Sequence, residues 1–120
     1  MELTLRQAFK KGLEAQRAGK VQEADRYYTA VLKAQPKNPE ANHNLGALAV
    51  GIGKVEEALP YLRKALEFNP EKAQFWLSYI DALMKLDLLD EAKVALAEAE
   101  SKGFVGQKID ELKTRLKRSN

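Results

Sequence analysis

The sequence has no cysteine among its 120 residues, which excludes disulfides, thiolate metal ligands and a cysteine nucleophile. Its longest stretch without charged or strongly polar side chains covers residues 45–53. This stretch is far too short to span a bilayer, which needs about 20 residues. Residues 1–6 contain no apolar stretch that resembles a signal peptide. We therefore expect a soluble, cytoplasmic protein.

Residues that carry catalysis are also scarce. His43 is the single histidine, and no group of residues has the spacing of metal ligands. The glycine-containing segment 51–54 follows an expected helix rather than a strand, so it does not match a phosphate-binding loop. The adjacent carboxylates of Glu56–Glu57 and Asp90–Glu91 point about 100° apart on a helix, so neither pair shares a site. The sequence predicts a non-catalytic protein without a metal or a cofactor.

The charged residues are unevenly distributed along the chain. The net charge is +3, which by itself does not indicate nucleic-acid binding. Residues 1–38 carry +4, residues 39–72 carry −1, residues 73–104 carry −3, and the last sixteen residues carry +3. One interpretation is a set of solvated helix faces. The other is a polarised rod whose basic start and acidic third quarter steer a charged partner or allow weak head-to-tail self-association.

The sequence repeats itself at an offset of 34 residues. Small, aromatic and proline positions recur in register over three windows, which chance rarely produces. The matched sets are Gly12 and Gly46; Gly19 and Gly53; Pro36 and Pro70; Ala24, Ala58 and Ala92; Tyr27 and Tyr61; Tyr28, Leu62 and Leu96.

Apolar residues within each window are spaced by three and four, which is typical of α-helices. Each unit therefore contains two helices, and no alternating pattern of a β-strand competes. The expected helices cover residues 5–18, 21–34, 40–52, 55–66, 71–86 and 88–99. Expected N-caps are Thr4, Asn38, Asn69 and Asp87, with prolines at the first helical position in Pro39 and Pro70.

Small residues predict how the helices pack. Gly12 and Gly46 lie in the middle of helices, where glycine costs about 1 kcal/mol relative to alanine. We expect a neighbouring helix to approach these two positions so closely that a side chain does not fit. Gly19 and Gly53 lie between paired helices, where a residue with positive φ is needed.

At this point the sequence resembles the tetratricopeptide repeat family, whose 34-residue unit has the pattern W-x2-L-G-x2-Y, then A-x3-F, then P. The middle unit matches best, with Leu45–Gly46, Ala58, Leu62 and Pro70, although Asn42 replaces the Trp. The resemblance implies an all-α, right-handed superhelical solenoid of three helical hairpins. The expected units cover residues 5–38, 39–72 and 73–104 of a single domain.

The last expected helix covers residues 106–118 and carries Ile109, Leu112 and Leu116 at helical spacing. A stacked array needs a terminal element with a polar outer face to cover its last apolar edge. We interpret this segment as a capping helix. The alternative is a basic amphipathic helix that binds a membrane surface or nucleic acid.

In this family the first helix of each pair lines a concave groove that holds an extended peptide or a partner helix. Carried over by position, the resemblance implies a groove lined by Arg6, Phe9, Lys10, Leu13, Arg17, His43, Asn44, Ala47, Val50, Gln74, Leu77, Ser78, Asp81 and Met84. Phe9, Leu13 and Leu77 have core packing as an alternative role. The basic residues Arg6, Lys10 and Arg17 favour a ligand with an acidic end and a few apolar anchors.

Two more specific functions of the family match this chain poorly. Chaperone co-factors clamp an acidic C-terminal tail with a set of Lys, Asn and Arg residues, and of that set the chain keeps only Asn44. O-linked N-acetylglucosamine transferases carry one groove asparagine in each repeat, whereas this chain has Lys10, Asn44 and Ser78 there. Neither the clamp nor the full asparagine ladder is predicted.

Two other functions are a repeat array that precedes a transferase domain and a nucleic-acid-binding protein. The chain also resembles the short repeat arrays that precede the catalytic domain of some bacterial glycosyl-, sulfo- and methyltransferases. In that case it docks a substrate or a partner protein for a larger enzyme. Helical repeats that read RNA need a polar base-reading position in many units, so three divergent units predict no nucleic-acid partner. We expect a protein or peptide partner and no membrane partner.

Overall fold

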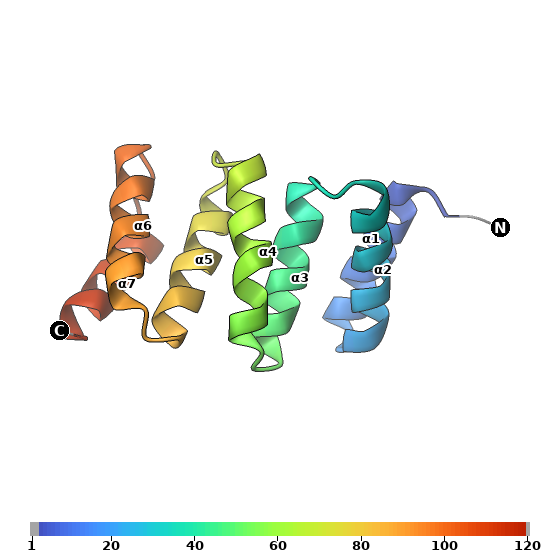
Figure 1. Ribbon diagram of the computed structural model, residues 1–120, viewed down its shortest axis with the longest axis horizontal. Helices are drawn as coiled ribbons and strands as arrows, with labels where there is room; N and C mark the ends of the chain where they lie inside the picture. The colour runs from blue at the N-terminus through green and yellow to red at the C-terminus, as the bar shows by residue number, and fades with distance from the viewer. Residues whose placement is uncertain (1–2, 120) are drawn as a thin grey trace.

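The computed structural model describes residues 3–119, and this part of the chain contains helices and no strand. The helices are α1 (Leu5–Arg17), α2 (Val21–Ala34), α3 (Pro39–Gly51), α4 (Val55–Phe68), α5 (Ala73–Lys85), α6 (Leu89–Ser101) and α7 (Gln107–Arg118). They stand side by side along one axis, with the two ends of the chain at opposite ends of the row (Figure 1). The dimensions of 53 × 27 × 22 Å describe a short rod. The predicted all-α helical solenoid is confirmed.

The helices keep the 34-residue register of the sequence throughout. The first helix of each pair begins at Leu5, Pro39 and Ala73, and α7 begins at Gln107. Each of these starts therefore lies 34 residues after the one before it. It follows that α7 occupies the place of the first helix of a fourth unit.

Two glycines let the paired helices of the first and second units approach closely. A Cβ atom built on Gly12 would lie 2.6 Å from Cε1 of Tyr28, and one built on Gly46 would lie 2.6 Å from Cδ2 of Leu62. Real Cβ atoms do not approach other atoms so closely, so the space that a side chain would need is already filled. The close approach predicted at both positions is present, and it occurs within each hairpin.

The turns between paired helices use a residue with positive φ. As predicted, Gly19 and Gly53 take this conformation, with φ of 75° and 83°. Asp87 lies one repeat after Gly53 and has φ of 59°. Its predicted role as an N-cap is wrong, because Asp87 forms the turn and α6 begins two residues later.

The N-caps were predicted correctly at two positions. The Thr4 side chain accepts from the Gln7 N–H within a capping box, and the Asn38 side chain accepts from the Ala41 N–H. Asn69 is not an N-cap: it is the C-cap of α4, and its side chain accepts from the Glu71 N–H at 3.2 Å in the following turn.

Of the two prolines predicted at the first position of a helix, one is confirmed and one is not. Pro39 stands at the first position of α3 as predicted. The prediction for Pro70 is wrong, because α5 starts at Ala73. The turn around Asn69 delays the helix by several residues, which leaves Pro70 in the connection.

The core is continuous in the C-terminal part of the rod. One buried apolar cluster joins α4, α5, α6 and α7, whereas two smaller clusters lie among the first three helices. Ile109, Leu112 and Leu116 of α7 are buried in the larger cluster. The apolar face of α7 is thus covered by its own chain and does not offer a membrane-binding surface. No helix within residues 3–119 is long and apolar enough to cross a membrane.

Candidate functional site

The first helices carry a chain of polar contacts that links neighbouring units. Nε2 of His43 lies 2.7 Å from Oγ of Ser78, and Nδ1 of His43 lies 3.1 Å from Oδ1 of Asn44. The Gln74 side-chain amide donates to the same Ser78 oxygen at 3.2 Å. Four residues predicted to line the groove are therefore in mutual contact at the junction of α3 and α5.

These contacts fix one arrangement of protons. Because the Asn44 oxygen is an acceptor, Nδ1 of His43 carries the proton and donates to it. Nε2 then accepts the hydroxyl proton of Ser78, whose oxygen remains free to accept from Gln74. This arrangement gives the uncharged imidazole a neutral hydrogen-bond partner at both ring nitrogens.

The surroundings of His43 also favour the neutral form. The residue is 8% exposed, and its ring stacks on Phe75 with centroids 4.7 Å apart. Burial lowers the pKa of His43 below its ordinary value, and the positive charge of Lys72 acts in the same direction. The Asn44 hydrogen bond and the negative charge of Glu40 oppose this change. The burial effect is the largest of the four.

Polar contacts continue toward the first unit through Tyr28. Its hydroxyl donates to Oε1 of Gln16 at 2.5 Å. Burial raises the pKa of Tyr28, while hydrogen bonding with Asn44 and the charge of Arg17 lower it. The sequence analysis identified Tyr28 only as a recurring repeat position and did not identify Gln16. The tyrosine at this repeat position was the available signal, because a buried tyrosine needs a hydrogen-bond partner for its hydroxyl.

The three basic residues predicted to line the groove lie on α1, and the charge of Arg17 acts on Tyr28 of this network. Arg6, Lys10 and Arg17 are exposed, and none of them pairs with a carboxylate among residues 3–119. Phe9 is partly buried and packs on Tyr28, with ring centroids 5.8 Å apart. The first unit therefore offers unpaired positive charge beside a partly covered aromatic ring.

The opposite end of the first-helix face has a hollow of about 270 Å³ between α5 and α7. Four predicted residues line it, together with four residues of α7 that lie 34 positions further along the chain. The members are Gln74, Leu77, Ser78 and Asp81, followed by Lys108, Glu111, Leu112 and Arg115.

Asp81, expected to provide a free negative charge at this end of the groove, forms ion pairs within the protein. Its carboxylate lies 2.9 Å from Nζ of Lys85 and 3.3 Å from a terminal nitrogen of Arg115. The acidic charge expected at this end is therefore neutralised by its own chain. Sequence reasoning missed the contribution of α7 to this face, although the 34-residue step from Asp81 to Arg115 was a visible signal.

The other predicted residues have intermediate exposure. Val50, Leu77 and Met84 pack against the large apolar cluster and keep part of their surface open. Leu13 and Ala47 are also partly exposed. These side chains form an apolar floor rather than isolated contacts. Within residues 3–119 no group of three or more His, Asp or Glu side chains is arranged to hold a metal ion.

The seven helices that the structure describes within residues 3–119 share one 34-residue register, which defines a helical-repeat protein. A family model described as tetratricopeptide repeat matches residues 9–66, and a second with the same description matches residues 49–116. The chain belongs to the tetratricopeptide repeat family. A comparison with curated protein sequences gives no match.

Many solved structures share the fold. The TPR2B domain of yeast Sti1, solved as a pHsp70 complex, is 20% identical with a TM-score of 0.87, covering 97% of this chain and 98% of that one. The first TPR of Spaghetti (RPAP3), bound to the HSP90 peptide SRMEEVD, is 20% identical with a TM-score of 0.87 over 96% and 91% of the two chains. The O-GlcNAc transferase of Thermobaculum terrenum is 27% identical with a TM-score of 0.73, over 82% of this chain and 20% of that chain.

Proposed function

We propose that the protein is a non-catalytic interaction module whose first-helix face binds an extended peptide with an acidic end. The observation that carries this proposal is that Arg6, Lys10 and Arg17 pair with no carboxylate of residues 3–119. A carboxylate at this end gains attraction without first breaking an existing ion pair. Two of the similar structures are themselves peptide complexes, which supports the same use of the fold.

The middle of the face supplies hydrogen bonds for a peptide backbone. Asn44, Gln74 and Ser78 lie next to each other and are held in place by His43. Polar groups that are already positioned lose little conformational freedom when they bind a ligand. Apolar side chains of the ligand would then contact the partly open surfaces of Val50 and Leu77.

The proposed recognition differs from the clamp of the chaperone co-factors. Phe9, Leu13, Gln74 and Ser78 stand where that resemblance requires Lys, Asn or Arg, and only Asn44 agrees with it. In our proposal the acidic end of the ligand binds the positive side of α1 instead. We expect SRMEEVD to bind more weakly than a peptide selected for this face.

A serine–histidine hydrogen bond is also part of a catalytic triad. The third member of a triad is a carboxylate, which stabilises the charged imidazolium. Here Nδ1 of His43 faces the neutral amide of Asn44. We therefore propose that Ser78 and His43 connect units and position the peptide, and that Ser78 is not a nucleophile.

The test uses two triple variants with the same change in charge. Arg6, Lys10 and Arg17 are replaced by Glu in one, and the exposed Arg26, Lys33 and Lys37 are replaced by Glu in the other. Immobilised wild-type protein and both variants are used to capture partners from a lysate, followed by peptide mapping of what binds. We expect the first variant to lose an acidic partner that the second retains. Equal capture by both variants would contradict the proposal.

A second candidate function is supported by the transferase among the similar structures. This chain corresponds to 20% of that protein at 27% identity. On this alternative the array presents a substrate or partner to a catalytic domain of a larger protein. The neighbouring coding sequence decides it: an in-frame transferase domain supports the alternative, and a stop codon with no such domain contradicts it.

A further inference from the structure

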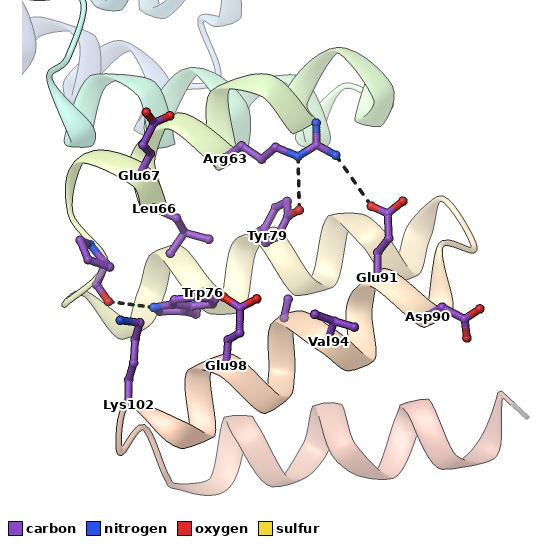
Figure 2. Close-up of a pocket in the computed structure, with 12 residues that line it drawn as sticks. Arg63, Leu66, Glu67, Trp76, Tyr79, Asp90, Glu91, Val94, Glu98 and Lys102 are labelled. Atoms are coloured by element: carbon purple, nitrogen blue, oxygen red, sulfur yellow. Dashed lines mark hydrogen bonds and ion pairs between the residues drawn. The ribbon is translucent and has the colours of Figure 1, made fainter.

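A second hollow lies on the side opposite the proposed peptide face. It has a volume of about 690 Å³ and lies between the second helices α4 and α6, with α5 at its base. Figure 2 shows Trp76 and Tyr79 of α5 between the two helices, with Leu66 of α4 above Trp76. We call this hollow the α4–α6 furrow. Its base is apolar and aromatic, which is the surface that buried anchor side chains of a partner prefer.

One of the differences between the repeats leaves space in the furrow. Tyr61 of α4 packs against the apolar cluster that contains Leu45 and Leu48, and so covers the corresponding position between α2 and α4. One repeat later the same position is Ala95, which lines the open furrow. The change from tyrosine to alanine removes a ring that would fill much of this space. Val94, next to it, is 60% exposed.

The charge beside the furrow is reversed between the same two repeats. Lys33 and Lys64 lie at the position between α2 and α4. Glu67 and Glu98 occupy the equivalent positions beside the α4–α6 furrow. Glu67 and Glu98 pair with no basic side chain in the part of the chain that the structure describes. Their negative charge is therefore available to a partner.

The ends of the furrow are held by the chain itself. Arg63 donates to the Tyr79 hydroxyl at 3.3 Å and lies 3.8 Å from Glu91 (Figure 2). At the other end the Trp76 indole N–H donates to the Pro70 carbonyl at 2.9 Å. Trp76 is 5% exposed, so most of the apolar surface left for a ligand belongs to the partly exposed Tyr79 and to Val94. These contacts hold the furrow in shape before anything binds, which lowers the entropic cost of binding.

We propose that the α4–α6 furrow docks a basic segment of a partner protein, with one or two large apolar side chains seated on Tyr79 and Val94 next to Trp76, and with flanking Lys or Arg residues beside Glu67 and Glu98. Two observations support this proposal. The negative charge of Glu67 and Glu98 complements a basic segment, and the furrow is open at Ala95 where the preceding repeat has Tyr61. The proposal is independent of the peptide face on the first helices. The two faces would bind ligands of opposite charge, so the module would bring two partners together.

The single tryptophan makes this proposal directly measurable. The probe is a synthetic peptide without Trp or Tyr, in which two leucines lie between lysines, and its control has glutamates in place of the lysines. We expect the basic peptide to change the emission of Trp76 saturably and more weakly as salt is raised. The acidic peptide should produce no change. Absence of saturable binding by the basic peptide at low salt would overturn the proposal.

Two variants locate the binding. In Glu67→Lys/Glu98→Lys both substitutions are at exposed positions, and we expect the affinity to fall at least about tenfold, because like charges then face each other. The matched control Lys33→Glu/Lys64→Glu changes the equivalent positions of the preceding repeat and should retain the affinity. Equal affinities for both double variants would overturn the proposal.

A third variant tests whether the basic peptide needs the open space beside Ala95. Ala95→Tyr restores the residue that fills the equivalent site and should remove binding of the basic peptide. Circular dichroism checks that this variant is folded, and the charge variants remain decisive if it is not. Sedimentation of the wild-type protein tests the competing occupant. Self-association that Glu67→Lys/Glu98→Lys abolishes would show that a second copy fills the furrow, which would overturn the proposal of a basic partner segment.

Discussion

Asn42 and Trp76 make the same hydrogen bond in successive units, although their side chains have little in common. The Asn42 amide donates to the Pro36 carbonyl at 3.1 Å, and the Trp76 indole donates to the Pro70 carbonyl at 2.9 Å. Both donors lie 34 residues apart, as do both acceptors. The repeat therefore preserves a contact between the start of one hairpin and the preceding connection while the residue type changes.

This relationship predicts the effect of removing either donor. Replacing Asn42 by Leu, which has a similar size, leaves the Pro36 carbonyl without that donor in a nearly dry site. We expect a loss of about 1–3 kcal/mol in the free energy of unfolding, measured by urea denaturation. Asn44 is less buried than Asn42, so Asn44→Ala, which changes the same residue type on the same helix, should cost less. An Asn42→Leu protein as stable as wild type would contradict this role.

The contact of Gly46 with Leu62 predicts opposite effects of two glycine substitutions in α3. Gly46→Ala places a methyl group 2.6 Å from Leu62, and we expect destabilisation of about 1–3 kcal/mol from overpacking. Gly51 has no atom within 4 Å of a Cβ. Gly51→Ala should therefore stabilise the protein by up to about 1 kcal/mol through helix propensity. Thermal unfolding of both variants measures these effects. Equal shifts of the two melting temperatures in the same direction would contradict the packing of Gly46 on Leu62.

The turn at Asp87 predicts a stabilising substitution. With φ of 59°, Asp87 adopts a backbone conformation that glycine reaches without steric cost. Asp87→Gly should raise the free energy of unfolding by up to about 1 kcal/mol. The reciprocal variant Gly53→Ala, at φ of 83°, should lower it. A destabilised Asp87→Gly protein would show that the aspartate side chain contributes more than its backbone strain.

His43 predicts how stability depends on pH. Burial lowers its folded-state pKa below the unfolded value of 6.5, so below pH 6.5 the unfolded chain binds more protons than the folded one. Stability from this group is therefore fully present above pH 6.5 and is lost as the pH falls from there toward the folded pKa. The slope cannot exceed about 1.4 kcal/mol per pH unit for one proton.

The measurement is urea unfolding at a series of pH values between neutral and mildly acidic. His43→Gln keeps a polar side chain but does not titrate, and its stability should vary less over this range than that of the wild type. Parallel curves for both proteins would show that His43 does not cause the loss.

The register of the helices was predictable because small residues recur at a fixed offset. Gly12, Gly46 and Gly53 report requirements for space and for positive φ that few other residues meet. The starts of α5 and α6 were misplaced because Asn and Asp satisfy several turn geometries. Only the three-dimensional turn shows that Asn69 ends a helix and that Asp87 takes the place of Gly53.

The candidate site was predictable by position but not by contact. The repeat pattern places His43 and Ser78 on the first helices, yet they are 35 residues apart and meet only because of how α3 packs on α5. The ion pair between Asp81 and Arg115 likewise depends on where α7 docks. The opening at Ala95 could not be predicted either, because alanine is common in helices and does not by itself indicate an open space.

The binding of an acidic-ended peptide to the first-helix face is tested most directly by an NMR titration of the isotopically labelled protein. The ligand is a short peptide selected from a library whose members end in acidic residues. We predict that the amide shifts of α1 residues near Arg6, Lys10 and Arg17 and the side-chain amide signals of Asn44 and Gln74 change together with one dissociation constant. Changes confined to α2, α4 and α6, with those signals unmoved at saturation, would contradict it.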